Sequence, residues 1–317
     1  MSDNTTYTPE EVAKILKISK YTVYELIKRG ELGAYRVGRK VRIEESDITS
    51  YKQKGKSLSQ GPDISDLPLT NSPGKTMPPS EPDINNGLVI CGQDIILDIL
   101  TRHLTKHFPN IKFLRNYIGS MDGLIALYKG QANAVTTHLW DRDTDDYNLP
   151  YIRRLLPGHP TTVINLVYRY EGFFVASGNP KKISSWSDLA RPDVRFINRE
   201  HGSGARVLLD EKLQIEKIPW HLINGYDDVE MSHMSVASKV ARKEADVGIG
   251  IEKVAMQVPG LEFIPLQKER YDLVIRQEDQ MKPHFQALLQ IIRSSTYRNE
   301  IEGLGGYDVS QMGKIMI

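Results

Sequence analysis

The chain has 317 residues, with 41 Lys and Arg against 40 Asp and Glu, and a single cysteine, Cys91. This length is enough for two or three domains and a sizeable core. One cysteine excludes an internal disulfide framework and a cysteine-rich zinc site, and the histidine spacing indicates no metal site. No apolar run reaches the ~18 residues of a membrane-spanning helix and the N-terminus lacks a signal-peptide core, so we expect a cytoplasmic protein without membrane contact.

Positive charge is concentrated in the first 56 residues. They hold 12 Lys and Arg against 8 Asp and Glu, which leaves 29 against 32 for the remainder. A basic head on a slightly acidic body is typical of a nucleic-acid-binding module attached to another domain.

Residues 1–56 predict two short helices, a hairpin and a third helix. Thr8 to Glu11 starts the first helix with a capping box. Ser19 caps the second, from Lys20 to Arg29, and two helices this close form a helix-turn-helix. Leu32 to Ile43 then predicts a hairpin turning at Gly38-Arg39, a basic wing, before a third helix begins near Ser46.

Residues 7–52 resemble the excisionase/MerR-like winged helix-turn-helix family. The resemblance rests on Tyr-Thr-Pro-Glu-Glu-Val-Ala, Ser-Lys-Tyr-Thr-Val-Tyr, Gly-Glu-Leu and Arg-Val-Gly-Arg-Lys-Val-Arg-Ile. It implies contacts of the second helix and the wing with double-stranded DNA. The DNA-binding residues predicted in this way are Lys20, Tyr21, Thr22, Tyr24, Lys28, Arg36, Arg39, Lys40 and Arg42. The alternative is a basic solvated face with the two tyrosines partly packed.

Residues 57–85 predict a flexible proline-rich linker. Proline, serine, glycine and asparagine are interleaved here, and too few apolar residues are present to offset the entropy of ordering. If DNA affinity responds to a ligand, we therefore expect a change of dimer geometry to carry the response rather than a rigid contact between modules.

Residues 86–317 alternate short apolar strands with amphipathic helices, which predicts an α/β fold with a largely parallel sheet. Such sheets bind ligands where strands end and helices begin. Candidate turns are Cys91 to Asp94, Gly119 to Met121, Thr136 to His138, and Gly202-Ser203-Gly204. The last joins a strand at Val194 to Asn198 to a helix from Ala205, and free N–H groups at a helix start bind anions.

Two extended segments, Phe173 to Ser177 and Tyr271 to Arg276, predict paired hinge strands between two lobes. Lobe one would comprise 86–176 and 271–317, and lobe two 177–270. A two-lobed α/β clamp with a cleft at its hinge is the architecture of periplasmic-type solute-binding domains.

Residues 87–312 resemble cytoplasmic domains related to periplasmic molybdate-binding proteins. The matching runs include Gly-Ser-Met-Asp-Gly-Leu, Tyr-Asn-Leu-Pro-Tyr, Arg-Arg-Leu-Leu-Pro-Gly and Phe-Ile-Asn-Arg with Gly-Ser-Gly-Ala-Arg. The resemblance implies binding of a tetrahedral oxyanion through hydroxyl and backbone N–H groups. Cys91 replaces an expected serine turn and Ala205 an expected threonine, while Arg199 suits a carboxylate or phosphate unless it pairs with Glu200 or Asp228.

We therefore expect a one-component transcription regulator whose clamp senses a small anion, molybdate or tungstate first, without enzymatic activity or a cofactor. The predicted ligand-binding residues are Cys91, Asp94, Ser120, Thr137, His138, Arg199, Ser203, Gly204, Ala205 and Arg206. The expected partners are DNA, the anion and a second copy of the chain, since paired half-sites favour a homodimer. The alternatives are an organic-anion sensor, an enzyme with the same clamp, and a dimerisation body without a ligand.

Overall fold

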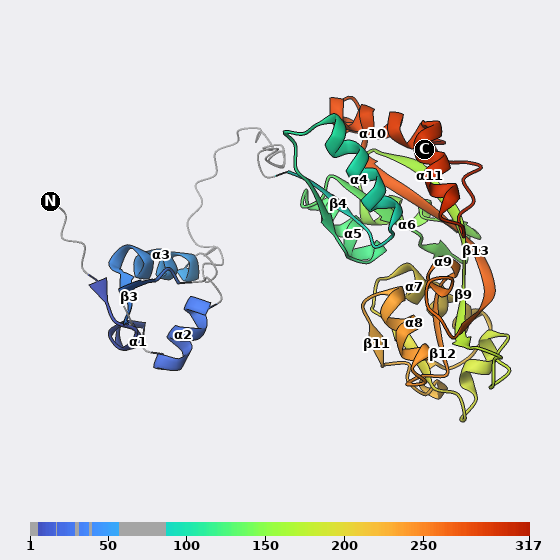
Figure 1. The fold of residues 1–317 in the computed structure, drawn as a ribbon, viewed down its shortest axis with the longest axis horizontal. Helices are drawn as coiled ribbons and strands as arrows, with labels where there is room; N and C mark the ends of the chain where they lie inside the picture. The colour runs from blue at the N-terminus through green and yellow to red at the C-terminus, as the bar shows by residue number, and fades with distance from the viewer. Residues whose placement is uncertain (1–5, 17, 29–31, 38–39, 57–86) are drawn as a thin grey trace, which may run out of the picture. The chain divides into compact units, whose positions relative to one another are not determined.

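The computed structural model describes residues 6–16, 18–28, 32–37, 40–56 and 87–317 (Figure 1). The predicted linker at 57–85 lies outside these residues. The chain forms two compact units, Met1–Lys75 and Thr76–Ile317, called here the N-terminal and C-terminal units. Within the described residues, no helix is long and apolar enough to cross a membrane.

The N-terminal unit combines three helices with a small antiparallel sheet of order β1-β3-β2. Its elements are β1 (Thr6–Tyr7), α1 (Pro9–Leu16), α2 (Lys20–Lys28), β2 (Tyr35–Val37), β3 (Lys40–Glu44) and α3 (Glu45–Lys56). The predicted capping box is confirmed, since Thr8 N donates to Glu11 Oε2 at 2.7 Å and Glu11 N to Thr8 Oγ1 at 3.4 Å. Thr22 N likewise donates to Ser19 Oγ at 3.0 Å. The predicted hairpin is also present, because β2 pairs antiparallel with β3.

The core of the N-terminal unit is built from the apolar faces of its helices and from the sheet. Its buried members are Val12, Ala13, Val23, Leu26, Leu32, Ile43 and Ile48. The predicted helix end at Gly30 and the wing turn at Gly38-Arg39 lie outside the described residues.

The C-terminal unit is built on one eight-stranded sheet of order β11-β10-β12-β9-β13-β6-β4-β5. The strands are β4 (Leu88–Cys91), β5 (Phe113–Asn116), β6 (Ala134–Thr137), β9 (Thr161–Ala176), β10 (Phe196–Arg199), β11 (Val229–Glu230), β12 (Val247–Ile251) and β13 (Leu261–Arg276). A separate ribbon pairs β7 (Trp140–Asp141) with β8 (Asp146–Tyr147). The α/β fold is confirmed, but the sheet is mixed rather than largely parallel.

Two 16-residue strands, β9 and β13, connect the lobes (Figure 1). They pair antiparallel with each other along their length, with register shifts near Pro265 and Tyr271. The segments expected as short hinge strands are ends of these long strands. Residues 171–175 of β9 pair with β12, so lobe two reaches back along β9 beyond the predicted boundary at residue 176. Local periodicity does not reveal such a crossing, because both ends of each strand are equally apolar.

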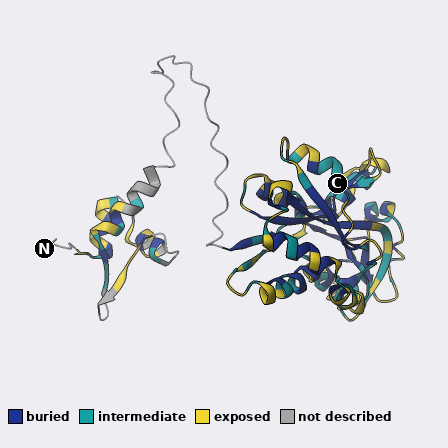
Figure 2. Cartoon of the chain, turned by 90° about the horizontal axis from the view of Figure 1, so that it is seen from above, coloured by how far each residue is buried: buried dark blue, intermediate teal, exposed yellow. Residues whose placement is uncertain are grey.

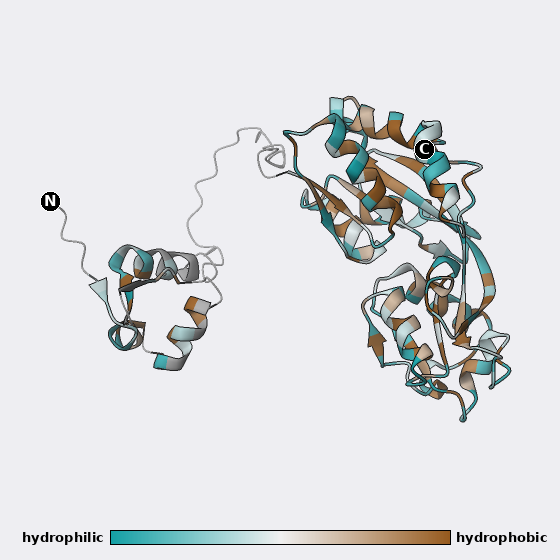
Figure 3. Ribbon diagram, in the orientation of Figure 1, coloured by the Kyte–Doolittle hydropathy of each residue, from teal (hydrophilic) through white to brown (hydrophobic). Residues whose placement is uncertain are grey.

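Helices cover both faces of the sheet in each lobe. Lobe one carries α4 (Ile96–His107), α5 (Ser120–Tyr128), α6 (Leu149–Leu155), α10 (Pro283–Arg293) and α11 (Ser295–Gly303); lobe two carries α7 (Gly204–Ile215), α8 (His233–Ala241) and α9 (Glu252–Ala255). Short 3-10 turns lie at Trp186–Ala190, Trp220–Leu222 and Gln277–Asp279. Buried residues follow the strands and the inner helix faces (Figure 2), where apolar residues also gather (Figure 3). Each lobe therefore has its own apolar layers.

Candidate functional site

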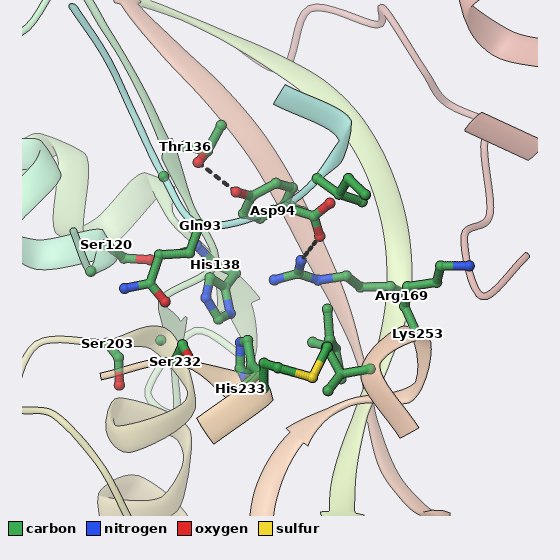
Figure 4. A pocket seen from close by; sticks show the side chains of 18 of the residues that line it. Gln93, Asp94, Ser120, Thr136, His138, Arg169, Ser203, Ser232, His233 and Lys253 are labelled. Carbon is green, nitrogen blue, oxygen red and sulfur yellow. Dashed lines mark hydrogen bonds and ion pairs between the residues drawn. The ribbon is translucent and has the colours of Figure 1, made fainter. Parts of the chain in front are cut away.

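A cavity of about 280 Å³ lies between the two lobes of the C-terminal unit, beside the crossing of β9 and β13. Figure 4 shows Gln93 and Ser120 on one side of it and Ser203, Ser232 and His233 on the other. Its polar lining comprises Gln93, Asp94, Asp98, Ser120, Thr136, His138, Arg169, Arg199, Ser203, Ser232, His233, Lys253, Gln257, Tyr271 and Tyr307. Both lobes thus contribute hydrogen-bonding groups to one cavity.

Three helices begin at this cavity: α5 at Ser120, α7 at Gly204 and α8 at His233. The first N–H groups of a helix have no partner within it, and the dipole makes this end positive. Helix starts from both lobes therefore converge on the cavity, which favours a negatively charged ligand.

The serine side chains at two of these helix starts serve as caps. Ser203 Oγ donates to Glu200 O at 2.9 Å and accepts from Arg206 N at 3.3 Å. Ser232 Oγ accepts from Ser235 N at 3.0 Å. These hydroxyls stabilise the helix ends and are only partly available to a ligand, so backbone N–H groups are the principal neutral donors here.

The lobes touch at the edge of the cavity. Met121 N at the start of α5 donates to Gly202 O of lobe two at 3.0 Å. Gln93 of lobe one accepts from Arg199 Nη2 at 2.7 Å and donates to Glu200 Oε1 at 3.1 Å. These contacts, together with the hydrogen bond from Lys253 Nζ of lobe two to Leu304 O of lobe one, hold the clamp closed.

Gly204 allows the start of α7 to approach His138 directly. A Cβ at position 204 would lie 2.4 to 2.6 Å from three atoms of the imidazole ring. His138 is itself fixed, because its Nδ1 lies 2.7 Å from Glu269 Oε2. The second glycine of the Gly202-Ser203-Gly204 turn therefore has a steric role at the site.

Arg199 is 1% exposed and combines a structural ion pair with a free donor. Its Nε and Nη2 donate to the two carboxylate oxygens of Glu200 at 2.7 and 2.8 Å. Nη1 is buried and has no hydrogen-bond partner among the described residues. The predicted salt bridge is therefore made with Glu200, whereas Asp228 pairs with Arg195 at 3.0 Å. One nitrogen of the guanidinium, the buried Nη1, therefore lacks a protein acceptor among the described residues, in a residue that lines the cavity.

A second buried arginine, Arg169 on β9, forms the floor of the cavity. It donates to Asp94 and Glu269 and stacks on the Tyr271 ring, with 4.1 Å from guanidinium carbon to ring centroid. Tyr307 OH also donates to Asp94 Oδ1, at 2.8 Å. Burial disfavours the ionised form of Glu269, but Arg169 and His138 outweigh this and hold its pKa below the usual range.

Glu171 lies beside this network, next to the carboxyl group of Glu269. It is fully buried, and neither of its oxygens accepts a hydrogen bond from an N–H or O–H donor of the described residues, so a hydrogen bond between Glu171 and Glu269 requires a proton on one of the two carboxyl groups. Burial, followed by the neighbouring Glu269, raises the pKa of Glu171 well above its ordinary value. His138, Glu171 and Glu269 bring possible metal-ligand atoms within 4.8 Å of one another.

Six of the predicted ligand residues line the cavity, and four do not. Those at the cavity are Asp94, Ser120, His138, Arg199, Ser203 and Gly204. Cys91 and Ala205 face apolar clusters instead, and burial raises the pKa of the Cys91 thiol to about 11. Thr137 is fully buried, and Arg206 pairs with Asp210 and stacks on Tyr226. Side chains at a strand end alternate between faces, so a turn places only some of its residues at the site.

The charged residues of the long strands were not among the predicted site residues. Arg169 and Glu171 on β9 and Glu269 on β13 interrupt otherwise apolar runs, and this interruption was the available signal. His233, Ser232 and Lys253 were also missed, because their turns carry no distinctive glycine pattern. His103 and His107, four residues apart on α4, do not line the cavity; His103 Nε2 lies 2.8 Å from Glu300 Oε2.

In the N-terminal unit, the described candidates for DNA contact lie at the surface. Lys20, Thr22 and Tyr24 on α2 are exposed, Lys20 being paired with Glu10, and Arg42 on β3 is half-buried. Tyr24 is 44% exposed, so it is only partly packed. The side chains of Tyr21, Lys28, Arg36 and Lys40, and all of Arg39, lie outside the described residues.

This fold and cavity define a two-lobed binding domain joined to a helix-turn-helix. Residues 101–293 match the PBP superfamily domain and residues 6–56 a helix-turn-helix domain. The uncharacterized protein YvgK of Bacillus subtilis is 41% identical over 317 residues, covering 100% of this chain and 99% of that protein. The chain belongs to the PBP superfamily and shares its whole length with this relative.

Two further comparisons cover parts of the chain. An uncharacterized Clostridium pasteurianum protein, encoded in the 5′ region of a 2Fe-2S ferredoxin gene, is 52% identical over 110 residues, 35% of this chain and 97% of that protein. A Clostridium perfringens protein described as a phosphate ABC transporter substrate-binding protein, solved with phosphate, superposes with a TM-score of 0.54 at 14% identity. It covers 70% of this chain and 99% of that chain. This second likeness concerns the fold alone.

Proposed function

We propose that the chain is a one-component transcription regulator in which an anion bound between the lobes of the C-terminal unit changes the affinity of the N-terminal unit for DNA. The observation that carries this proposal is the cavity, where three helix starts from both lobes converge beside the free Nη1 of Arg199. The helix-turn-helix match at residues 6–56 supports DNA as the partner. Action on DNA in turn favours a cytoplasmic location.

The effector we propose is a small anion. Molybdate or tungstate is favoured by the backbone N–H donors at the helix starts, which suit a tetrahedral oxyanion. A carboxylate-bearing organic anion is favoured by two other features: a cavity of about 280 Å³ and the unpartnered Nη1 of Arg199 among the described residues. The two candidates differ in their expected dependence on Arg199, since a carboxylate would gain a charge-assisted hydrogen bond from Nη1.

The proposed mechanism is a shift between open and closed clamps. An anion that touches helix starts of both lobes binds the closed form better, and only such differential binding moves the equilibrium. In a homodimer, closing both clamps would change the distance between the two DNA-binding units. We propose binding without chemical conversion, so NMR should recover the effector unchanged after incubation with the protein.

Calorimetric melting of the full chain tests the binding half of this proposal. The panel contains molybdate, tungstate, sulfate, phosphate and a set of amino and keto acids. An effector at about 100 times its Kd should stabilise the C-terminal unit by roughly 2.7 kcal/mol, a rise of several degrees in Tm. A flat panel would contradict the sensor and leave the C-terminal unit as a dimerisation body.

A matched pair of variants locates the effector. Arg199→Lys keeps the charge beside Glu200 but removes the planar donor face, so it should weaken a carboxylate effector about tenfold or more and an oxyanion less. Arg195→Lys is the control, because Arg195 is exposed and pairs with Asp228 outside the cavity. Equal stabilisation of both variants by an organic anion would contradict its placement at Arg199.

A further inference from the structure

We propose that His138, Glu171 and Glu269 form a binding site for one divalent transition-metal ion of the Zn²⁺ or Mn²⁺ class, at the crossing of β9 and β13. This site is additional to the proposed effector site and does not depend on the identity of the effector. It revises the expectation from the histidine spacing, because the three residues come from three separate strand regions.

The spacing of the ligand atoms fits one ion. His138 Nδ1 lies 2.7 Å from Glu269 Oε2 and 3.9 Å from Glu171 Oε2. In a tetrahedral site, metal–nitrogen and metal–oxygen bonds of about 2.0–2.2 Å place two ligand atoms roughly 3.3–3.6 Å apart. The two His138 distances lie on either side of this range, so shared coordination requires small movements of both glutamate side chains, Glu269 away from His138 and Glu171 toward it.

Glu171 supplies the independent observation. Buried carboxylates in native proteins almost always have hydrogen-bond partners, and an exception requires an explanation. Asp272, also fully buried, accepts from Asn148, Asn165 and Arg270. Neither oxygen of Glu171, by contrast, accepts from an N–H or O–H donor of the described residues; its close polar neighbours are the carboxyl group of Glu269 and the imidazole of His138, 3.9 Å away. A metal ion would satisfy both oxygens.

The charges of the buried residues around Glu171 also favour a bound cation. Asp94, Glu171 and Glu269 bring three carboxyl groups into one buried cluster, where Arg169 is the shared cation. Arg199 is already paired with Glu200. With all three carboxyl groups ionised the cluster needs about two more positive charges, which a divalent ion provides, because unpaired buried charges are strongly disfavoured.

The donor set indicates the class of metal. One imidazole and two carboxylates match Zn²⁺, Mn²⁺ and related first-row ions, whereas Ca²⁺ and Mg²⁺ prefer oxygen ligands alone. Arg169 donates to Glu269 Oε1 and would orient that carboxylate from behind. His138 also lines the effector cavity, so the ion would lie just behind the cavity wall.

The test is a metal titration of the full chain after chelator treatment and dialysis. Zn²⁺ and Mn²⁺ are titrated by calorimetry, and bound metal is counted by elemental analysis after a second dialysis. We expect about one ion per chain. Glu171→Gln should bind at least about 100-fold more weakly, because losing even an outer partner of a metal ligand costs 10–100-fold. Glu216→Gln, an exposed change at the residue that follows α7, should bind as the wild type does.

Folding of the variant is checked separately. Since no N–H or O–H donor of the described residues reaches Glu171, and a glutamine of similar size can keep a hydrogen bond to Glu269, Glu171→Gln should melt as cooperatively as metal-free wild type. His138→Gln provides a second loss of ligand, and the visible absorption of bound Co²⁺ should change with it. Equal metal affinity of the wild type, Glu171→Gln and His138→Gln would overturn the proposal, as would less than a tenth of an ion per wild-type chain. If Glu171→Gln melts non-cooperatively, the His138→Gln comparison decides.

Discussion

The ends and the middle of β9 and β13 differ in what they bury. Toward the ends, Val163, Phe173 and Leu273 are fully buried in apolar clusters under helices. Toward the middle, Arg169, Glu171 and Glu269 are equally buried but charged or titratable. Apolar burial stabilises at about 25 cal/mol per Å², whereas a buried ion pair often contributes nothing net. The ends therefore stabilise the apolar core of each lobe, whereas the middle carries buried polar groups, among them Arg169, which lines the cavity.

The largest effect is expected at an apolar end. Phe173→Ala removes a ring that packs edge-on against Trp186, 5.0 Å between centroids, in the core of lobe two. We expect a loss of about 3–5 kcal/mol in the free energy of unfolding of the C-terminal unit, measured by urea denaturation. Tyr170→Ala on the same strand, half-exposed, is the control and should cost far less. Equal losses of unfolding free energy in the two variants would contradict a larger contribution of the buried ring of Phe173 to stability.

Cys91 tests whether the end of β4 belongs to the apolar layer or to the cavity. Burial raises the pKa of its thiol from 9.0 to about 11, so the thiolate fraction at pH 8 should be about 100-fold below that of an ordinary thiol. Alkylation of the native chain by iodoacetamide should be at least that much slower than in urea, followed by mass spectrometry. Rapid native labelling, prevented by an effector, would place Cys91 at the site after all.

Gly204→Ala tests the contact between the start of α7 in lobe two and His138 in lobe one. Its Cβ would meet the His138 ring, which Glu269 holds in place, so one lobe must shift. We expect a loss of roughly 1–3 kcal/mol, measured by calorimetric melting, and a weaker response to the effector. Gly303→Ala is the control, because a Cβ there meets nothing within 4 Å, and its Tm should be unchanged or slightly higher. Matching Tm changes would show that the lobes are not in contact at Gly204.

The smallest effect concerns the surface pair of Lys268 and Asp308, 2.6 Å apart. Hydrogen bonds from Lys268 and Ser310 lower the pKa of Asp308 from 3.8 to about 2. A lowered carboxyl pKa stabilises above the unfolded value and loses this contribution as pH falls from about 4 to 2. Both side chains are more than one-third exposed, so Asp308→Asn should cost at most about 1 kcal/mol at pH 7 and nothing at pH 2, by urea denaturation. An equal loss of stability in Asp308→Asn at pH 7 and at pH 2 would show that the ion pair of Lys268 and Asp308 does not cause the loss.

Local signals in the sequence predicted the elements well. The caps at Thr8 and Ser19, the strand at Leu88–Cys91 and the Gly202-Ser203-Gly204 turn each depend on residues a few positions apart. The buried network does not, since Arg169 and Glu269 are 100 residues apart in the sequence. Its members come together only through the register of β9 with β13. Single-residue periodicity carries no information on that register, so the central charges of the site could not be predicted.

We propose that an anion bound in the cavity of the C-terminal unit controls the affinity of the chain for DNA. The most direct test of this proposal takes an anion that stabilises the C-terminal unit and a DNA site selected by the full chain from random sequences. Fluorescence anisotropy then measures the Kd for this DNA with and without the anion, at fixed salt, for wild type, Arg199→Lys and Arg195→Lys. We predict that the anion changes the Kd for DNA about fivefold or more in wild type and Arg195→Lys. The change should be smaller in Arg199→Lys. An unchanged Kd in wild type with saturating anion would contradict it.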